Sequence, residues 1–276
     1  MEFKPPAFAK LENNAAPTYQ YAVCTLVTNL EEYGQMVQSF IDAGFTQDIC
    51  EYRYIDNSKT NTFEAYEGLN LFLQKADAEY IILCHQDVLL QFDGILQLNH
   101  QIAEISKLDN NWAVLSNAGG LENDLYRRFV VNIVYPDGLY ECNANFPKKV
   151  VTVDENFIVV KRSANLALSH DLKGFHLYGT DICLVAELLG FTAYAIEFKL
   201  LHKSYGNADD SYQDILQKLI AKYTHFMRSR YVLTTIAHFY LSASTWRTRW
   251  FKTKMGSKIS RKLTKIAANN VMNNKK

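Results

Sequence analysis

The sequence predicts an α/β protein built on a mostly parallel sheet with helices on its faces. Short apolar, β-branched runs alternate with segments whose apolar residues recur at helical spacing, and polar or turn-forming residues separate them. The chain has 276 residues, of which 48% are hydrophobic and 21% are charged, which is typical of a globular protein. A chain of this length can bury a substantial core.

The first half of the chain carries the alternation most clearly. Residues 21–29 (YAVCTLVTN) predict a buried strand, and the next segment has the apolar spacing of one helix face until it closes near Gly44. A second strand is expected at 50–58, a helix at 62–76, and a third strand at 79–87 (EYIILCHQD). Strands joined by helices in such short order favour parallel pairing.

The second half continues the pattern with one interruption. In order, we expect a helix at 94–108, a strand running into glycines at 112–120, an irregular excursion or hairpin at 121–150, two strand-like runs within 150–163, a helix at 179–191 and a last strand at 192–204. The predicted domains are an N-terminal arm (1–20), one α/β domain (21–207) and a basic helical C-terminal region (208–276). No Gly/Ser-rich linker precedes that region, so we expect it to pack on the domain.

Charge is distributed unevenly along the chain. Residues 1–214 contain 15 Lys and Arg against 29 Asp and Glu, whereas residues 215–276 contain 14 Lys and Arg and no acidic residue. A basic tail that also carries Trp246 and Trp250 is typical of interfacial helices on anionic membranes. We therefore expect an anionic membrane surface as a partner and no nucleic acid. The alternative is a tail that docks on its own acidic domain.

Cysteine usage and the N-terminus point to a cytoplasmic protein. The five cysteines form no CxxC pair, and four of them lie in apolar runs, as expected for free thiols in a reducing compartment. The first twenty residues contain no apolar signal-peptide core, and the C-terminal apolar run is too short to span a bilayer. We expect a cytoplasmic location, with the inner face of the membrane as the surface that the tail reaches.

Polar residues follow each of the first three predicted strands. Right-handed crossovers would bring these three clusters to one edge of the sheet, where α/β proteins bind ligands. The clusters are Thr28 and Asn29, then Asp56, Asn57 and Ser58, then His85, Gln86 and Asp87. The sequence contains neither GxGxxG after the first strand nor GxxxxGK[ST], so a bound nucleotide would need another partner for its phosphates, such as a divalent cation held by Asp87.

The order YAVCTLVTN, YRYIDNS, EYIILCHQDV, YGTDICLVAELLGF and LLHKS resembles the family 2 glycosyltransferases of GT-A (Rossmann-like) fold. Within that family it is most similar to the branch that resembles the streptomycin-biosynthesis glycosyltransferase, over roughly residues 20–205. The resemblance implies a nucleotide-diphospho-sugar donor, a glycan or lipid-linked acceptor, and Mn²⁺ or Mg²⁺ as cofactor. It also implies inversion at the sugar carbon and a role in surface polysaccharide or lipopolysaccharide synthesis.

The resemblance also implies roles for individual residues. The family's Asp-x-Asp metal motif corresponds to His85-Gln86-Asp87, so Asp87 is the expected metal ligand, with His202 after the last strand and His85 as further ligands. The expected nucleotide-binding residues are Thr28, Asn29, Asp56, Asn57 and Gln86.

The general base of the family corresponds to Asp181 in YGTDICL, with Asp154 and Glu155 as rivals. Asp181 could instead cap its helix, a common role for Asp. Because His85 replaces the first acid of the metal motif, a non-catalytic nucleotide-sugar-binding protein is an alternative to the enzyme. A peripheral membrane scaffold that acts through its tail is a third hypothesis.

Overall fold

The computed structural model describes residues 16–122, 128–206, 210–251, 253, 255–256 and 258–259. Contacts divide the chain into two compact units, Met1–Ile215 and Leu216–Lys276. The predicted domain boundaries remain a prediction. Most of the expected N-terminal arm (1–15) and the last part of the basic tail (260–276) lie outside the described residues.

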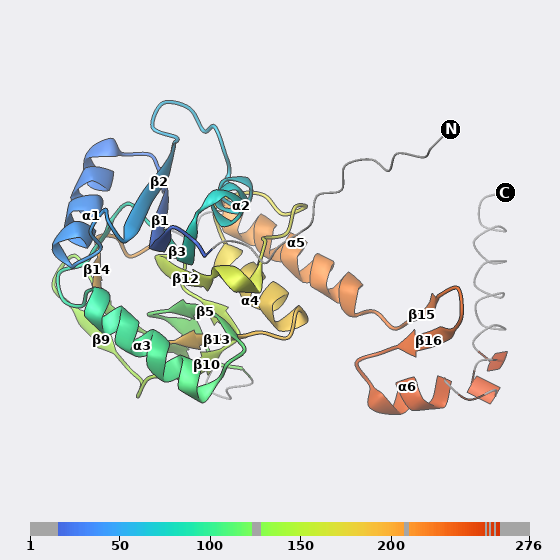
Figure 1. The fold of residues 1–276 in the computed structure, drawn as a ribbon. Helices are drawn as coiled ribbons and strands as arrows, with labels where there is room; N and C mark the ends of the chain where they lie inside the picture. Colours follow the sequence, from blue (N-terminus) through green and yellow to red (C-terminus); the bar gives the residue numbers. More distant parts are fainter. Residues whose placement is uncertain are drawn as a thin grey trace, which may run out of the picture. The chain divides into compact units, whose positions relative to one another are not determined.

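A seven-stranded sheet forms the centre of the first unit (Figure 1). Its strand order is β10 (Lys148–Val150), β13 (Thr192–Ala195), β5 (Trp112–Ser116), β12 (Phe157–Lys161), β3 (Ala78–Cys84), β1 (Tyr19–Val27) and β2 (Cys50–Asp56). β1 pairs in parallel with β2 and β3, and β13 pairs in parallel with β5. The α/β class with a mostly parallel sheet is therefore confirmed. Strand β12 lies antiparallel between β3 and β5, a feature that the sequence pattern does not reveal.

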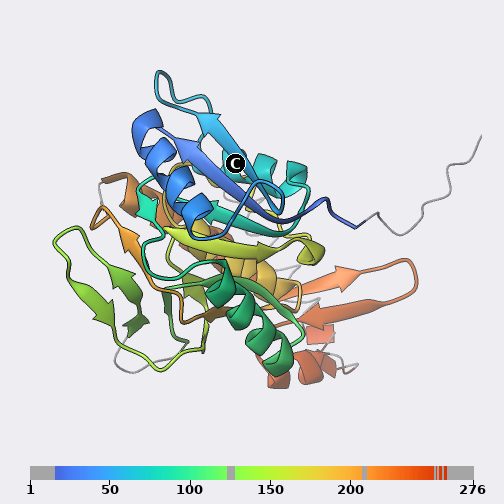
Figure 2. The same cartoon turned by 60° about the vertical axis from the view of Figure 1, so that its left-hand side comes forward.

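Helices cover both faces of this sheet (Figure 2). Helices α1 (Leu30–Asp42) and α3 (Ile95–Leu108) supply Met36, Phe40 and Leu98 to one buried cluster, together with Tyr21 of β1. Helix α2 (Ala65–Lys75) packs on the opposite face, where a Cβ on Gly68 would lie 2.7 Å from the side chain of Leu26. Helix α4 (Tyr178–Leu188) packs against β5 and β13. Each face of the central sheet is therefore covered by helices and buries its side chains in a core.

Two smaller sheets flank the central one. One has the order β4 (Val88–Leu89), β14 (Leu200–His202), β8 (Asn132–Val134) and β9 (Tyr140–Cys142). The other has the order β11 (Thr152–Val153), β6 (Gly119–Gly120) and β7 (Phe129–Val130). The segment 192–204, expected to be one strand, is therefore two strands, β13 and β14, in different sheets. The expected excursion at 121–150 contains the β8–β9 hairpin; residues 123–127 lie outside the described part.

The C-terminal segment combines helices with a β-hairpin. Helix α5 (Asp210–Met227) precedes strands β15 (Arg230–Leu233) and β16 (His238–Leu241), and α6 (Thr245–Phe251) follows them. The expectation of a helical tail did not include this antiparallel hairpin, which forms where β-branched and aromatic residues concentrate in RYVL and HFYL. No helix within the described residues is long and apolar enough to cross a membrane.

Candidate active site

The ends of β1, β2 and β3 meet at one edge of the central sheet. In the parallel pair of β1 and β2, Val27 lies opposite Asp56, and β3 runs parallel on the other side of β1. The polar residues that follow these strands therefore start from neighbouring positions. The edge predicted from the sequence is thus present.

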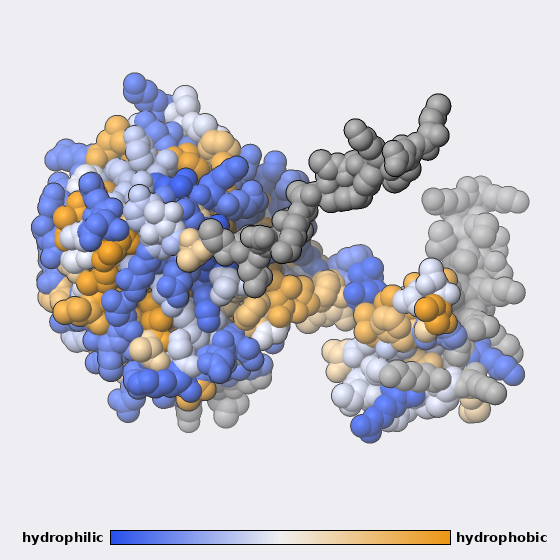
Figure 3. Space-filling model, in the orientation of Figure 1, coloured by the Kyte–Doolittle hydropathy of each residue, from blue (hydrophilic) through white to orange (hydrophobic). Residues whose placement is uncertain are grey.

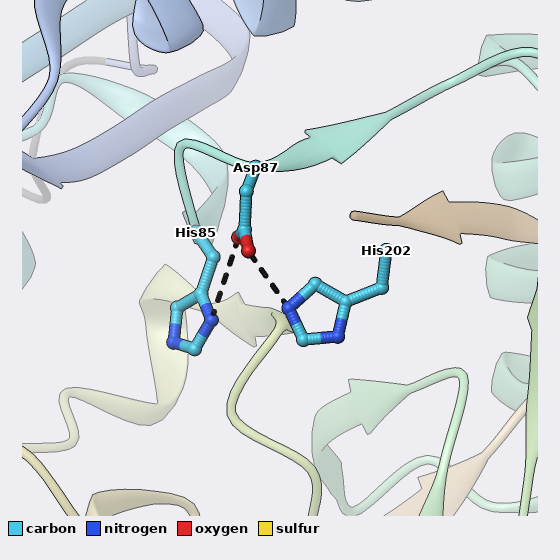
Figure 4. A group of neighbouring side chains, drawn as sticks. All are labelled: His85, Asp87 and His202. Atoms are coloured by element: carbon cyan, nitrogen blue, oxygen red, sulfur yellow. Dashed lines mark ion pairs between the residues drawn. The ribbon is translucent and has the colours of Figure 1, made fainter. Parts of the chain in front are cut away.

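Three potential metal ligands converge beside this edge. One ligand atom from each of His85, Asp87 and His202 lies within 4.8 Å of the others (Figure 4). The Nε2 atom of His202 is 3.4 Å from Oδ1 of Asp87, and the Nδ1 atom of His85 is 4.0 Å from the same oxygen. Two imidazoles and one carboxylate that face one another in this way could hold a divalent cation.

Backbone pairing brings His202 to Asp87. Strand β14 pairs antiparallel with β4, and His202 is the partner of Val88 in that register. The backbone N–H of Lys203 donates a hydrogen bond of 2.9 Å to the carbonyl oxygen of Asp87. The sheet that contains β4 and β14 therefore holds His202 close to Asp87, although the two residues are far apart in the sequence.

Tyr178 sets the orientation of the His85 ring. The Tyr178 hydroxyl lies 2.7 Å from Nε2 of His85 and donates to the carbonyl oxygen of Glu155 at 3.3 Å. A hydroxyl that donates its proton to that carbonyl accepts one from Nε2–H of His85. In that tautomer, Nδ1 of His85 carries the free lone pair and faces Asp87, as a metal ligand requires.

The protonation states also suit metal binding. The pKa of Asp87 is held well below its usual range: burial acts to raise it, but the hydrogen bond with His202 and the charges of His202 and His85 outweigh burial. Burial and the neighbouring His202 lower the pKa of His85, against the opposite effect of Asp87 and Asp154. An ionised carboxylate next to a neutral imidazole is the state from which both bind metal.

A cavity of about 250 Å³ opens beside two of the three candidate ligands, His85 and Asp87. Its polar lining comes from Thr28, Gln86, His85, Asp87 and Tyr178. Its apolar lining comes from Leu26, Ala65, Leu69, Leu83, Cys84 and Phe175. A pocket with one apolar wall and a few convergent polar groups is the usual form of a small-molecule site.

Gln86 ties the ends of β3 and β1 together. Its Oε1 accepts hydrogen bonds from the backbone N–H groups of Thr28 (2.8 Å) and Asn29 (2.9 Å), and its Nε2 donates to Oγ1 of Thr28 (2.9 Å). The side chain of Asn29 in turn caps α1 by accepting from the N–H groups of Glu31 and Glu32. These three predicted nucleotide-binding residues therefore form one connected group at the sheet edge.

The two predicted residues after β2 differ in exposure. Asp56 is exposed and accepts from the backbone N–H and the hydroxyl of Ser58, and these bonds lower its pKa. Asn57 is buried, and its amide holds the following loop by bonding to the backbone of Thr62 and Phe63. Neither is among the described residues that line the cavity. Asp56 is thus exposed at the end of β2 and bonded to Ser58, whereas the amide of Asn57 is engaged by its own loop.

Asp181 is buried away from the cavity. It is 0% exposed and accepts hydrogen bonds of 2.7 Å from both the backbone N–H and the hydroxyl of Ser169. It does not cap α4 either, because the N-cap residue is Leu177 in a left-handed conformation and Asp181 lies in the first turn. A general base must reach the hydroxyl that it deprotonates. The position of Asp181 instead fits an anchor between α4 and the Ser169 segment, and the sequence-based expectation of a base stays a prediction.

The two rival carboxylates lie between β11 and β12. Glu155 accepts a hydrogen bond of 3.1 Å from the N–H of Gly179 at the start of α4. Burial raises the pKa of Glu155 to about 8, although the Gly179 bond acts in the opposite direction. Asp154 accepts from the N–H of Asn156 at 2.9 Å, and its charge acts on His85. Of the three carboxylates, Asp154 is the one with an electrostatic link to the ligand cluster.

We expect Glu155→Gln to stabilise the protein at neutral and alkaline pH. Because the pKa rises from about 4.5 to about 8 on folding, the stability that Glu155 contributes is fully present below pH 4.5 and is lost as the pH rises through 8. Glutamine can still accept from Gly179 and does not ionise. Urea unfolding should show that the variant's advantage in free energy of unfolding grows with pH and reaches about 5 kcal/mol above pH 8.

The matched control for this measurement is Glu187→Gln, which removes a carboxylate from an exposed position of α4. Parallel pH profiles for wild type and Glu155→Gln would contradict the expected result.

Tyr178 lies beside the ligand cluster, and the sequence analysis assigned it no role. Its contact with His85 joins the start of α4 to the end of β3, and no local pattern in the sequence signals a pairing at that separation.

No family model matches this chain. A relative from Fuscovulum blasticum, the ATP synthase subunits region ORF 6 protein, is 30% identical over 228 residues, which cover 82% of this chain and 92% of the relative. Among solved structures, GalNAc-T7 with UDP, GalNAc and Mn²⁺ is 10% identical with a TM-score of 0.46, covering 68% of this chain and 44% of that one. S. aureus TarS 1–349 is 11% identical with a TM-score of 0.41, covering 76% of this chain and 73% of that one. The two structural likenesses do not extend to function.

Proposed function

The chain belongs to the same family as the ATP synthase subunits region ORF 6 protein of Fuscovulum blasticum, and we propose that its members are metal-dependent glycosyltransferases of the GT-A type. The reaction is transfer of a sugar from a nucleotide-diphospho-sugar donor to a glycan or lipid-linked acceptor. The observation that carries the proposal is the cluster of His85, Asp87 and His202, of which His85 and Asp87 line a cavity at the ends of parallel strands. The sequence resemblance to family 2 glycosyltransferases, including the streptomycin-like branch, supports the same reaction.

The three candidate metal ligands favour Mn²⁺ over Mg²⁺ as the cofactor. Mg²⁺ prefers an octahedral shell of oxygen ligands, whereas imidazole nitrogens suit transition metals. Two of the three side chains here are histidines, and Tyr178 holds one of them in the ligating tautomer. When bound, the ion would neutralise charge on the leaving diphosphate.

The other residues around the cavity would bind the nucleotide. The apolar wall that includes Leu26 and Leu69 offers a surface for a nucleobase or ribose, and Thr28, Asn29 and Gln86 form the polar edge. Asp56 is exposed at the end of the neighbouring strand β2, where it would accept hydrogen bonds from the nucleoside.

Asp154 is the proposed general base. Its carboxylate acts on His85, whereas Glu155 is held at the start of α4 and Asp181 is buried against Ser169. A carboxylate near the donor can take the proton of an acceptor hydroxyl as the new glycosidic bond forms on the face opposite the diphosphate. That geometry would invert the sugar carbon.

The proposed setting is the cytoplasmic face of a membrane, in surface polysaccharide or lipopolysaccharide synthesis. Lipid-linked acceptors lie at that face, and the cations of the C-terminal region are suited to anionic lipid headgroups.

The proposal is tested by thermal unfolding of the full chain with UDP, GDP and their sugar conjugates, with and without Mn²⁺. A ligand at about 100 times its dissociation constant stabilises a protein by about 2.7 kcal/mol, which raises the midpoint of thermal unfolding by roughly 5–10 °C in a chain of this size. We expect such a rise with at least one nucleotide, in the presence of Mn²⁺.

If no nucleotide raises the midpoint with or without Mn²⁺, the proposal fails. A rise without any release of nucleoside diphosphate from the sugar conjugate, with water or added acceptors, would favour the non-catalytic nucleotide-sugar-binding protein.

A further inference from the structure

The tip of the β15–β16 hairpin exposes two aliphatic side chains. The strands pair from Arg230 opposite Leu241 to Leu233 opposite His238, so the turn begins directly after Leu233. Leu233 is 82% exposed and Ile236, within the turn, is 95% exposed. Isolated apolar residues are common on surfaces, but two adjacent ones at the outermost point of a hairpin form a small apolar end.

Thr234 and Ala237 pair several polar groups within this turn. The N–H of Thr234 donates to the carbonyl oxygen of Ala237 at 2.7 Å, and the N–H of Ala237 donates to Oγ1 of Thr234 at 2.8 Å. The Thr234 hydroxyl also donates to the Ala237 carbonyl at 2.8 Å. Unsatisfied backbone groups are what makes an irregular segment costly to place in hydrocarbon. Moving this turn into hydrocarbon should therefore cost less free energy than moving a loop without internal hydrogen bonds.

An aromatic cluster packs the strands of the hairpin against α6. The ring of Tyr240 lies 4.9 Å from that of Tyr231 and 4.5 Å from that of Phe251 in α6. The Tyr231 hydroxyl donates to the carbonyl oxygen of Phe251 at 3.2 Å. The tip therefore extends from a packed base, and its exposed side chains are not covered by this part of the chain.

Cations and an exposed tryptophan accompany the hairpin. Residues 216–276 contain 14 Lys and Arg and no acidic residue. In α6, Arg247 and Arg249 are exposed, and Trp246 is 67% exposed and stacked on Trp250 at 6.1 Å. Hydrophobic and hydrophilic residues lie close together on the C-terminal unit (Figure 3). Tryptophan with cations is the composition of a surface that meets lipid headgroups.

We propose that the β15–β16 hairpin is a membrane-docking element whose tip, Leu233 and Ile236, enters the apolar region of an anionic bilayer. The arginines of α6 bind the lipid phosphates, and Trp246 lies at the level of the headgroups. A single-stranded nucleic acid would also attract the cations, but it is bound through aromatic stacking, and the outermost residues here are aliphatic. The inference rests on the proposed membrane association of the tail and is independent of sugar transfer.

The test is co-sedimentation of the full chain with vesicles of phosphatidylcholine alone or of phosphatidylcholine and phosphatidylglycerol. We expect binding to the anionic vesicles that weakens with salt. The double substitution Leu233→Ser with Ile236→Ser should weaken it by at least about tenfold, because two apolar side chains no longer enter the bilayer. Substituting Arg247→Gln with Arg249→Gln should weaken binding and reduce its salt dependence.

A matched control separates the tip from apolar exposure in general. Leu96 and Leu108 in α3 are 83% and 64% exposed, and replacing both with Ser should leave vesicle binding unchanged. Circular dichroism and nucleotide binding report that each variant is folded.

Each outcome bears on one proposal. If wild type does not bind anionic vesicles, the membrane association and the hairpin's role both fail, whatever the nucleotide assays show. If the tip variant binds as tightly as wild type, the hairpin's role alone fails. If wild type binds poly(U) RNA in preference to anionic vesicles, the surface is a nucleic-acid site and the proposal is overturned.

Discussion

Replacing Asp87 with Asn is expected to abolish Mn²⁺ binding and, with it, release of nucleoside diphosphate from the donor. Asp87 is the single carboxylate of the cluster, and its Oδ1 lies 3.4 Å from His202 and 4.0 Å from His85. Loss of an outer partner of a metal ligand costs about 10–100-fold in metal affinity, so loss of the ligand's charge should cost more than about 100-fold. Calorimetric titration of the full chain with Mn²⁺ measures this directly.

Asp56→Asn is the matched control for that experiment. It removes one carboxylate from the neighbouring strand end, where Asp56 is exposed and bonded to Ser58. We expect this variant to bind Mn²⁺ like wild type and to bind the nucleotide more weakly. Unchanged Mn²⁺ affinity in Asp87→Asn would remove the cluster from the proposed site, and His202→Asn then gives a second measurement of whether any of the three residues binds the ion.

Parts of this site could be predicted from the sequence because they follow from the backbone topology. A polar residue that ends a strand in a parallel sheet must lie at the ligand-binding edge, and so the sequence places Thr28, Asp56 and Asp87 there without knowledge of side-chain packing. The resemblance adds His202, whose place beside Asp87 depends on the β4–β14 pairing.

The remaining features depend on contacts that local sequence does not encode. Asp181 lies in the first turn of a helix, in a motif that resembles a catalytic one, but its partner is the Ser169 segment, which supplies both of its 2.7 Å hydrogen bonds. The amide of Asn57 is likewise engaged by its own loop. Tyr178 acts on His85 across two elements. In each case the type of residue was visible, and the partner that determines its role was not.

The antiparallel strand β12 shows the same limit at the level of the fold. Its run, FIVVK, is as apolar as the parallel strands beside it, because both faces of the sheet are covered in this region. The direction of β12 depends on how the chain enters it from β11. The periodicity of side chains gives no information about that direction.

A large loss of rate without loss of Mn²⁺ binding is expected from Asp154→Asn. If Asp154 removes the proton of the acceptor, asparagine at this position should lower the turnover number by about 10²–10⁴-fold, because the amide cannot take a proton at neutral pH. The substitution preserves local structure, since the amide oxygen can still accept from the N–H of Asn156. Release of nucleoside diphosphate from the donor, with water as acceptor, measures the rate before the natural acceptor is known.

The rival carboxylates make this result decisive, because each substitution has a different expected outcome. Glu155→Gln should retain turnover, since the amide oxygen can keep the bond from Gly179 and the residue acts by holding the start of α4. Asp181→Asn should lower stability, since replacing the buried carboxylate weakens its two hydrogen bonds from Ser169. Mn²⁺ and nucleotide affinity should be unchanged in Asp154→Asn. If that variant turns over normally and Glu155→Gln does not, the base is Glu155, and the buried carboxyl with a pKa of about 8 would then impose a rate that rises through that pH.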